Sequence, residues 1–406
     1  MLKALRQPQL LRLWFGQACS SVGDEIYRVG LTWFAVGLMG ANTGYLAAGQ
    51  TAALMLLSFI GGKWADQWHP LRTMVGVDLL RAVIVLIPVV VSFFIPLPLT
   101  VLWAVALTLS ALSAFFDPAT QATIPLLAKD TETMQATNGL MGTTIRMARM
   151  VGPAIVGLLS AFIPMIHFFT LDALTFIVSA LSVNSLKKSI PANLNEEQTH
   201  RPSFIKTIAS GFELVREKTG MSYIFFTKAI TTGTWNLALM IGFPLLIHEM
   251  THGDAKAFGL VMASYGLGNF AGSLYFGNRA RKRLLYLLYS GYMWLGLGFM
   301  LIGLAPSISL VIIAAALAGL TGPMNDLAFI DLMQKKFPVR DLTKVFRLKM
   351  AVESAGTLFF TLISPLLIKG LSVRTVIIFC GVIWVLNGVG GFVIQTLSPA
   401  ASRAED

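Results

Sequence analysis

Apolar residues along this chain come in long blocks rather than in alternating or short amphipathic runs. The blocks are about 20 residues long, which is the length of helix needed to cross a hydrocarbon core about 30 Å thick. Glycine, proline, asparagine and charged residues separate the blocks. We predict membrane-spanning helices over residues 10–40, 44–65, 73–95, 98–117, 134–162, 166–186, 220–248, 257–278, 284–305, 308–332, 345–368 and 372–396.

A long polar stretch, residues 187–201, divides these blocks into six and six. The segment 203–218 follows it and is typical of an amphipathic helix on the membrane surface. We therefore predict an N-terminal six-helix bundle over 1–186, a cytoplasmic linker with an amphipathic helix over 187–219, and a C-terminal six-helix bundle over 220–406.

The two halves resemble each other. Gly62–Arg72, after the second block, matches Gly272–Lys282, after the eighth, and Ile124–Leu126 matches Ile330–Leu332 in the equivalent place. Two matches at nearly the same offset favour a duplicated unit with the solute site at the interface between halves. The predicted fold class is an all-α integral membrane protein, with twelve transmembrane helices in two pseudo-symmetric six-helix bundles.

Composition and charge agree with a membrane protein. The 406 residues are 55% hydrophobic and 13% charged, whereas soluble domains are about a quarter charged. With the N-terminus inside, most lysines and arginines lie on the cytoplasmic side, and only Lys256, Lys369 and Arg374 lie outside. We expect a multi-pass protein with both termini in the cytoplasm. Its net charge of +11 faces anionic membrane lipids, so no nucleic-acid partner is expected.

The sequence lacks the motifs of several enzyme classes. Cys19 and Cys380 lie inside apolar blocks, so we expect no disulfide framework and no zinc site. There is no nucleotide-binding loop, no Gly-x-Ser-x-Gly elbow and no metal-ligand box. We predict that the chain is not an enzyme and uses no cofactor or bound metal, and that a proton gradient drives it.

Short motifs in the first half resemble those of one large transporter family. They are Trp14–Gln17, Ser21–Asp24, Gly62–Asp66, Asp78–Arg81, Asp117–Ala119, Ala136–Gly139 and Gly152–Gly157. On these residues the chain resembles the major facilitator superfamily, and within it the branch of macrolide-efflux proteins and catecholate-siderophore exporters. The resemblance implies an efflux protein of the bacterial cytoplasmic (inner) membrane. We expect it to act as a monomer.

Four polar residues, Ser21, Asp24, Glu25 and Arg28, cluster near the middle of the first block. Spacings of three and four residues put them on neighbouring parts of one helix face. At this depth an ionised side chain is costly unless it is paired or reaches water. In one interpretation the face lines the central cavity, and Asp24 or Glu25 exchanges a proton beside Arg28. In the other, a static Asp24–Arg28 pair holds the helix to its neighbours. Two acids and one base leave one carboxylate without an opposite charge, which favours the first interpretation.

The fifth block contains two further candidates. Arg146 and Arg149 lie one turn apart and could hold a carboxylate or phosphate of the solute. Alternatively, they pair with acids such as Asp24, Glu25 or Asp117, or extend toward the cytoplasm. Gly152, Pro153 and Gly157 resemble the antiporter signature, which implies a gating hinge that does not contact solute; ordinary close helix packing is the alternative.

Charged residues near the first cytoplasmic loop are candidates for gating. Asp66 and Arg72, with Asp78 and Arg81 just inside the third block, could latch one conformation. The alternative is solvated or lipid-facing charge. The loop departs from the family pattern, because only Arg72 remains of several basic residues.

The second half offers aromatic, amide and acidic side chains at mid-depth, which suit an organic solute. These candidate solute-binding residues are Trp235, Asn236, Tyr265, Asn269, Asn325, Asp326 and Glu353. Packing is the alternative role for each of them. Lys228 either pairs with Glu353 or anchors the cytoplasmic end of its helix.

We therefore predict proton-coupled export of a small organic solute by alternating access. The solute is either a siderophore-like anionic metabolite or an amphipathic drug, and the two arginines favour the anion. One alternative is a lysophospholipid or lipid translocator. Another is a divalent-metal exporter like the ferroportins, against which stands the lack of soft or imidazole ligands beside Asp24.

Overall fold

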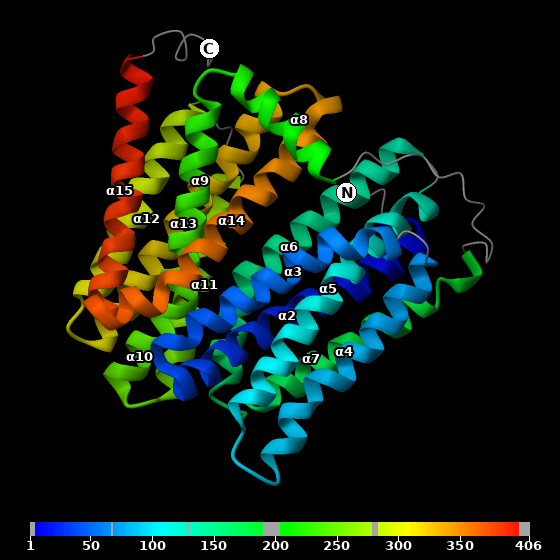
Figure 1. The fold of residues 1–406 in the computed structure, drawn as a ribbon, viewed down its shortest axis with the longest axis horizontal. Coiled ribbons are helices and arrows are strands. Elements are labelled where there is room, and N and C mark those ends of the chain that lie inside the picture. Colours follow the sequence, from blue (N-terminus) through cyan, green and yellow to red (C-terminus); the bar gives the residue numbers. More distant parts are fainter. Residues whose placement is uncertain (1–4, 66–67, 129, 190–203, 278–282, 398–406) are drawn as a thin grey trace. The chain divides into compact units, whose positions relative to one another are not determined.

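The computed structural model describes residues 5–65, 68–128, 130–189, 204–277 and 283–397. All regular secondary structure in these ranges is helical (Figure 1), which confirms the predicted all-α class.

Contacts between residues divide the chain into two compact units. The first consists of Met1–Leu38 and Gly49–Thr199, and the second of Met39–Ala48 and His200–Asp406. The first turn of the second long helix is thus grouped with the second unit, together with the 3-10 turn η1 (Gly40–Asn42).

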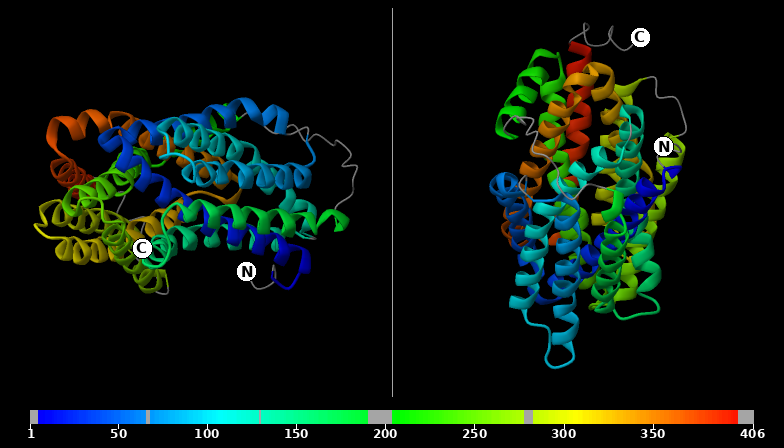
Figure 2. Two further views of the ribbon diagram at one scale, coloured as in Figure 1. Left: turned by 90° about the horizontal axis from the view of Figure 1, so that it is seen from below. Right: turned by 90° about the vertical axis from the view of Figure 1, so that its right-hand side faces the viewer.

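The long helices of the first unit match the predicted blocks. They are α2 (Pro8–Met39), α3 (Thr43–Ala65), α4 (Pro70–Ser92), α5 (Leu99–Leu127), α6 (Thr131–Leu159) and α7 (His167–Asn184), followed by the 3-10 turn η2 (Lys187–Ser189). Helices α4 and α5 run side by side and are joined by a short turn (Figure 2).

Helix α5 extends about ten residues beyond its predicted end, because the prediction treated Asp117 and Pro118 as a break. Helix α5 contains Pro118 and does not end there. Thr120 Oγ1 donates to the Phe116 carbonyl at 3.1 Å, and Thr123 Oγ1 to that of Ala119 at 2.9 Å.

The main part of the second unit, His200–Asp406, begins with the predicted amphipathic helix. Its elements are α8 (Phe204–Glu217), α9 (Met221–Trp235), the π-helical segment η3 (Asn236–Gly242), α10 (Phe243–Thr251), α11 (Ala255–Gly277), α12 (Leu284–Leu304), α13 (Ile308–Lys336), α14 (Val339–Leu371) and α15 (Val373–Leu397). Helix α8 packs against α14 (Figure 1), where Gly211 lies against the backbone of Lys344.

Among the described residues, eight helices are long and apolar enough to cross a membrane. Helix α2 is not one of them. Every stretch of 18 residues within α2 contains Asp24 and Glu25 together with Arg12 or Arg28, so no such stretch is purely apolar. The charges that remove α2 from this group are the ones that make it a candidate functional helix.

Small residues set the helix contacts that position the site in the second unit. A β-carbon on Gly233 would lie 2.4 Å from the carbonyl oxygen of Gly356, and one on Gly356 would lie 2.0 Å from that of Ala229. Helices α9 and α14 therefore approach each other backbone to backbone. In lipid, where the surroundings are as apolar as leucine, such close van der Waals contact is a main source of association.

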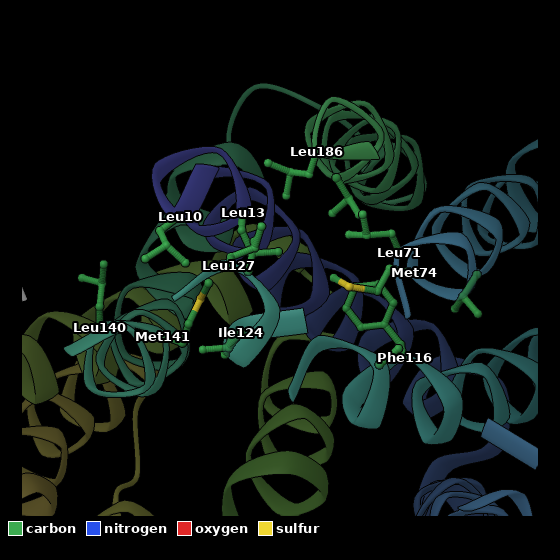
Figure 3. Packing of buried hydrophobic residues seen from close by; sticks show 13 residues of the cluster. Leu10, Leu13, Leu71, Met74, Phe116, Ile124, Leu127, Leu140, Met141 and Leu186 are labelled. Atoms are coloured by element: carbon green, nitrogen blue, oxygen red, sulfur yellow. The ribbon is translucent and has the colours of Figure 1, made fainter. Parts of the chain in front are cut away.

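An apolar cluster fixes α2 within the first unit. Leu10 and Leu13 of α2 are buried with Met74 of α4, Phe116 of α5 and Met141 of α6 (Figure 3). The cluster lies about three helical turns before the charged residues of α2. It therefore sets the direction in which those residues project.

Candidate functional site

Glu25 lies on the buried side of α2 and faces two bases. Arg28, one turn later, donates from Nη2 to Glu25 Oε2. Arg149 of α6 places Nε 3.8 Å from Glu25 Oε1. The Glu25 side chain is 9% exposed, whereas that of Arg149 is 69% exposed. Glu25 is thus the carboxylate that the two arginines neutralise.

Asp24, the adjacent residue, lies on the other side of this turn and is exposed. It interacts electrostatically with Arg81, Arg149, Glu25 and Asp117. Asp117 of α5 is also exposed. The static Asp24–Arg28 pair is therefore not present, because Arg28 pairs with Glu25 instead. An accessible carboxylate beside another carboxylate can take up a proton or a cation.

The glycine of the Gly-Pro segment lies directly against this turn. Gly152 is buried, and a β-carbon there would lie 2.6 Å from the Cβ of Glu25. Helix α6 is continuous through the segment, and Gly157 is also buried. The side chains of Pro153 and Arg146 lie outside the described residues. The gating role of this segment stays a prediction.

Asp78 and Arg81 are both buried. Neither is therefore a solvated or lipid-facing charge, which was the alternative to gating. Arg81 Nη1 lies 3.7 Å from Asp78 Oδ1, and Nη2 donates to Ser113 Oγ of α5 at 2.8 Å. The Arg81 guanidinium also lies 4.5 Å from the ring centre of Phe116. Arg72 is exposed at the start of α4. Asp66 lies outside the described residues, and gating by this group remains a prediction.

In the second unit, Trp235 and Asn236 occupy the junction between α9 and the π-helical segment. Trp235 Nε1 donates to the Tyr265 hydroxyl of α11 at 2.9 Å. Asn236 Nδ2 donates to Thr357 Oγ1 of α14 at 3.2 Å. Asn269, one turn after Tyr265, packs beside Gly322 of α13. The structure thus brings these polar groups of α9, α11 and α14 together.

Lys228 forms a charged network with two of the predicted acids. Its Nζ lies 2.5 Å from Asp326 Oδ1 and 4.0 Å from Glu353 Oε1. Lys349 donates to Glu353 Oε2 at 2.7 Å. The Lys228 side chain is 7% exposed and that of Asp326 is 63% exposed. Of the two roles left open for Lys228, the contact with Glu353 is present, but Asp326 is the closer partner.

Asn325 points away from this network, although it precedes Asp326. It is fully buried, and its Nδ2 donates to the carbonyl of Gly322 at 2.7 Å. Adjacent residues on a helix are about 100° apart, so only one of the two can face Lys228.

Asp172 of α7 and Tyr27 of α2 are both buried, and neither is among the candidate residues predicted from the sequence. Asp172 is the one acidic residue within the apolar block 166–186, and that isolation was the available signal. Tyr27 follows Asp24 by three residues and therefore lies near it on the helix.

Known proteins resemble this chain along most of its length. The MFS_3 family, described as transmembrane secretion effectors, matches residues 1–331. Macrolide efflux protein A of Streptococcus pyogenes is 23% identical over 349 residues, which cover 84% of this chain and 85% of that protein. The staphyloferrin A transporter of Staphylococcus aureus is 24% identical over 256 residues, which cover 62% of this chain and 63% of that protein.

The fold is also similar to that of solved transporters. A crystal structure of a POT family transporter in complex with a thioalcohol-conjugated peptide has a TM-score of 0.64 and 17% sequence identity, and it covers 96% of both chains. The major facilitator resemblance and its macrolide-efflux and siderophore branch are confirmed, and the chain is a multi-pass efflux transporter of the drug or siderophore type at the level of its family. The chain belongs to the MFS_3 family of transmembrane secretion effectors.

Proposed function

We propose that this chain exports a small organic solute from a bacterial cell in exchange for protons. The observation that carries the proposal is the contrast between two adjacent carboxylates. Glu25 is buried and faces two arginines, whereas Asp24 is exposed. A carboxylate inside a membrane protein that keeps access to water can bind and release a proton. Asp24 is the proposed proton-coupling residue, and Glu25 with Arg28 holds the turn that presents it.

The proposed architecture has twelve membrane crossings in two pseudo-symmetric bundles, with both termini in the cytoplasm. Two helix pairs of the first unit have counterparts in the second, which supports this arrangement. Helix α4 contacts α5 and α7 in the first unit, and α12 contacts α13 and α15 in the second. Such repeats typically operate by alternating access, in which one repeat moves against the other.

The proposed solute is an amphipathic, drug-like organic cation. Asp24 and Asp117 are exposed acids, so a cation and a proton would compete for the same carboxylate. Competition of this kind is sufficient for exchange, because each ligand displaces the other. In the second unit, the partly exposed ring of Trp235 is a candidate contact for the apolar part of a solute. The similarity to a macrolide efflux protein supports this class.

An anionic, siderophore-like solute is the second candidate, and one observation favours it. The Arg149 side chain is 69% exposed although its Nε lies near Glu25. Its remaining guanidinium donors could hold a solute carboxylate. The similarity to the staphyloferrin A transporter supports this candidate.

The test is solute flux in proteoliposomes under an imposed pH gradient. Three probes are compared: ethidium, a polycarboxylate siderophore and a lysophospholipid. We expect ethidium to accumulate in the acidic compartment, and this accumulation to stop when an ionophore collapses the gradient. Asp24→Asn should abolish it, whereas Glu213→Gln, which alters an exposed acid on α8, should leave it intact.

Two results would count against the proposal. If the flux of all three probes is independent of the pH gradient, proton coupling is excluded. Full gradient-driven flux in Asp24→Asn would exclude Asp24 as the coupling residue. Gradient-driven siderophore flux without ethidium flux would select the anionic solute instead, and flux of the lysophospholipid alone would select a lipid translocator.

A further inference from the structure

Asp172 of α7 points directly at the backbone of α2. Its side chain is fully buried. A β-carbon on Gly23 would lie 2.6 Å from Asp172 Oδ1, so the carboxyl group rests against the residue that precedes Asp24. A buried acid therefore lies behind the exposed one, on the neighbouring helix.

The carboxyl group of Asp172 has few partners. Thr175 Oγ1 lies 3.4 Å from Oδ1 but donates at 2.8 Å to the Asp172 carbonyl. Oδ2 is buried, and no described residue donates a hydrogen bond to it. In the described part of the chain no base lies within ion-pair distance of Asp172, because the nearby Arg81 pairs with Asp78.

The groups that face Asp172 are Asp24 and Tyr27 from α2, and Asp78 and Arg81 from α4. Among these described residues, three carboxyl groups surround one guanidinium. An ionised carboxylate buried without a base costs several kcal/mol. A carboxylic acid in the same place avoids that cost. The surroundings of Asp172 therefore suit the neutral acid, whereas Asp78 has a base beside it.

We propose that Asp172 is an inner proton-binding residue that exchanges its proton with Asp24. In the transfer, the O–H bond on Asp24 breaks and one forms on Asp172, so the negative charge moves to the exposed residue. Tyr27 interacts electrostatically with both acids, and its buried hydroxyl has no described hydrogen-bond partner. The role of Asp172 in coupling rests on the proton-driven function proposed above. The assignment of a bound proton to Asp172 is independent of that function.

The test compares Asp172→Asn with Asp78→Asn in the purified full-length protein. Both residues are fully buried, so the variants are matched in depth. An amide resembles a neutral acid, so Asp172→Asn should keep the thermal unfolding midpoint of the parent. Asp78→Asn should lower it, because Arg81 loses its partner. Infrared spectra should show a protonated-carboxyl C=O band in the parent that is lost in Asp172→Asn and kept in Asp78→Asn.

Transport gives the second readout. Asp172→Asn should lose gradient-driven ethidium accumulation, and Asp172→Glu should restore at least part of it. The inference is overturned if the infrared band persists in Asp172→Asn, or if that variant is destabilised as much as Asp78→Asn or fails to fold. If the parent shows no gradient-driven flux and yet the band disappears in Asp172→Asn, the proposed function fails while the assignment of the proton stands.

Discussion

A β-carbon on Gly152 would lie 2.6 Å from the Cβ of Glu25 and 3.3 Å from its Cγ. Helix α6 can therefore approach α2 at the level of the ion pair only because position 152 has no side chain. Arg149, which reaches Glu25 with its Nε, lies one turn earlier on the same helix. The missing side chain at Gly152 thus allows Arg149 to lie within ion-pair distance of Glu25.

Gly152→Ala should push α2 away from α6 and lower the free energy of unfolding. Forcing extra atoms into a packed contact typically costs about 1–3 kcal/mol. We expect a lower unfolding midpoint in detergent, measured by differential scanning fluorimetry. The control is Gly76→Ala on α4, where an added β-carbon meets no atom within 4 Å. Alanine favours a helix over glycine by about 0.5–1 kcal/mol, so the control should be neutral or stabilising. Equal midpoints in the two variants would contradict the close approach.

Asp24→Asn and Glu25→Gln should separate function from stability. Glu25→Gln leaves Arg28 and Arg149 without their shared carboxylate and should cost about 1–3 kcal/mol of unfolding free energy. Asp24→Asn changes an exposed side chain and should stay within about 0.5 kcal/mol of the parent. Chemical or thermal unfolding of both variants measures the difference. A loss of stability in Asp24→Asn that matches Glu25→Gln would mean that Asp24 also holds the fold.

Lys228 and Asp326 should be energetically coupled. Asp326→Asn removes the nearest carboxylate from a buried ammonium group, so it should destabilise more than the double variant Lys228→Met/Asp326→Asn. A double-mutant cycle should give a coupling energy within the range of about 0.5–3 kcal/mol found for contacting residues. The control pair is Lys344 with Asp341, at 2.8 Å but with Lys344 42% exposed. Its coupling should be about 0.2–1 kcal/mol, and a larger value there than at Lys228 would contradict the prediction.

Trp235→Phe should weaken solute binding. The change removes part of an aromatic surface and the hydrogen bond to Tyr265. An aromatic contact contributes about 0.5–1.5 kcal/mol, so the Kd for ethidium should rise about two- to tenfold. Fluorescence titration of the purified protein measures it. Trp294→Phe alters a tryptophan that is 58% exposed and should leave the Kd unchanged. Equal effects of the two substitutions would remove Trp235 from the proposed site.

The helix boundaries could be predicted because membrane thickness sets the length of each apolar block locally. The predicted end of α5 was wrong, because a charge and a proline that usually end a helix lie inside this one. Asp117 and Pro118 look like a helix end, yet α5 continues through them to Leu127. The π-helical segment was not predicted either, because hydropathy does not report which carbonyl each amide bonds.

The site could be predicted only in part. Spacing brought Asp24, Glu25 and Arg28 onto one turn, but it could not decide which acid pairs with the arginine. Nor could it show that Arg149 of α6 places its Nε 3.8 Å from Glu25 Oε1. Likewise the pair of Lys228 and Asp326 joins residues 98 positions apart. Contacts between distant helices depend on packing, which a single sequence pattern does not contain.

The π-helical turn after Trp235 has a consequence for motion. Residues 236–242 hold their amides to carbonyls one residue further back than in an α-helix. If this stretch returns to α-helical pairing, the residues before it rotate by about 100° against those after it. Lys228 and Trp235 would then turn together relative to Phe243–Thr251. The helix formed by α9, η3 and α10 therefore contains a point of rotation. This point lies between the charged network at Lys228 and the end formed by Phe243–Thr251.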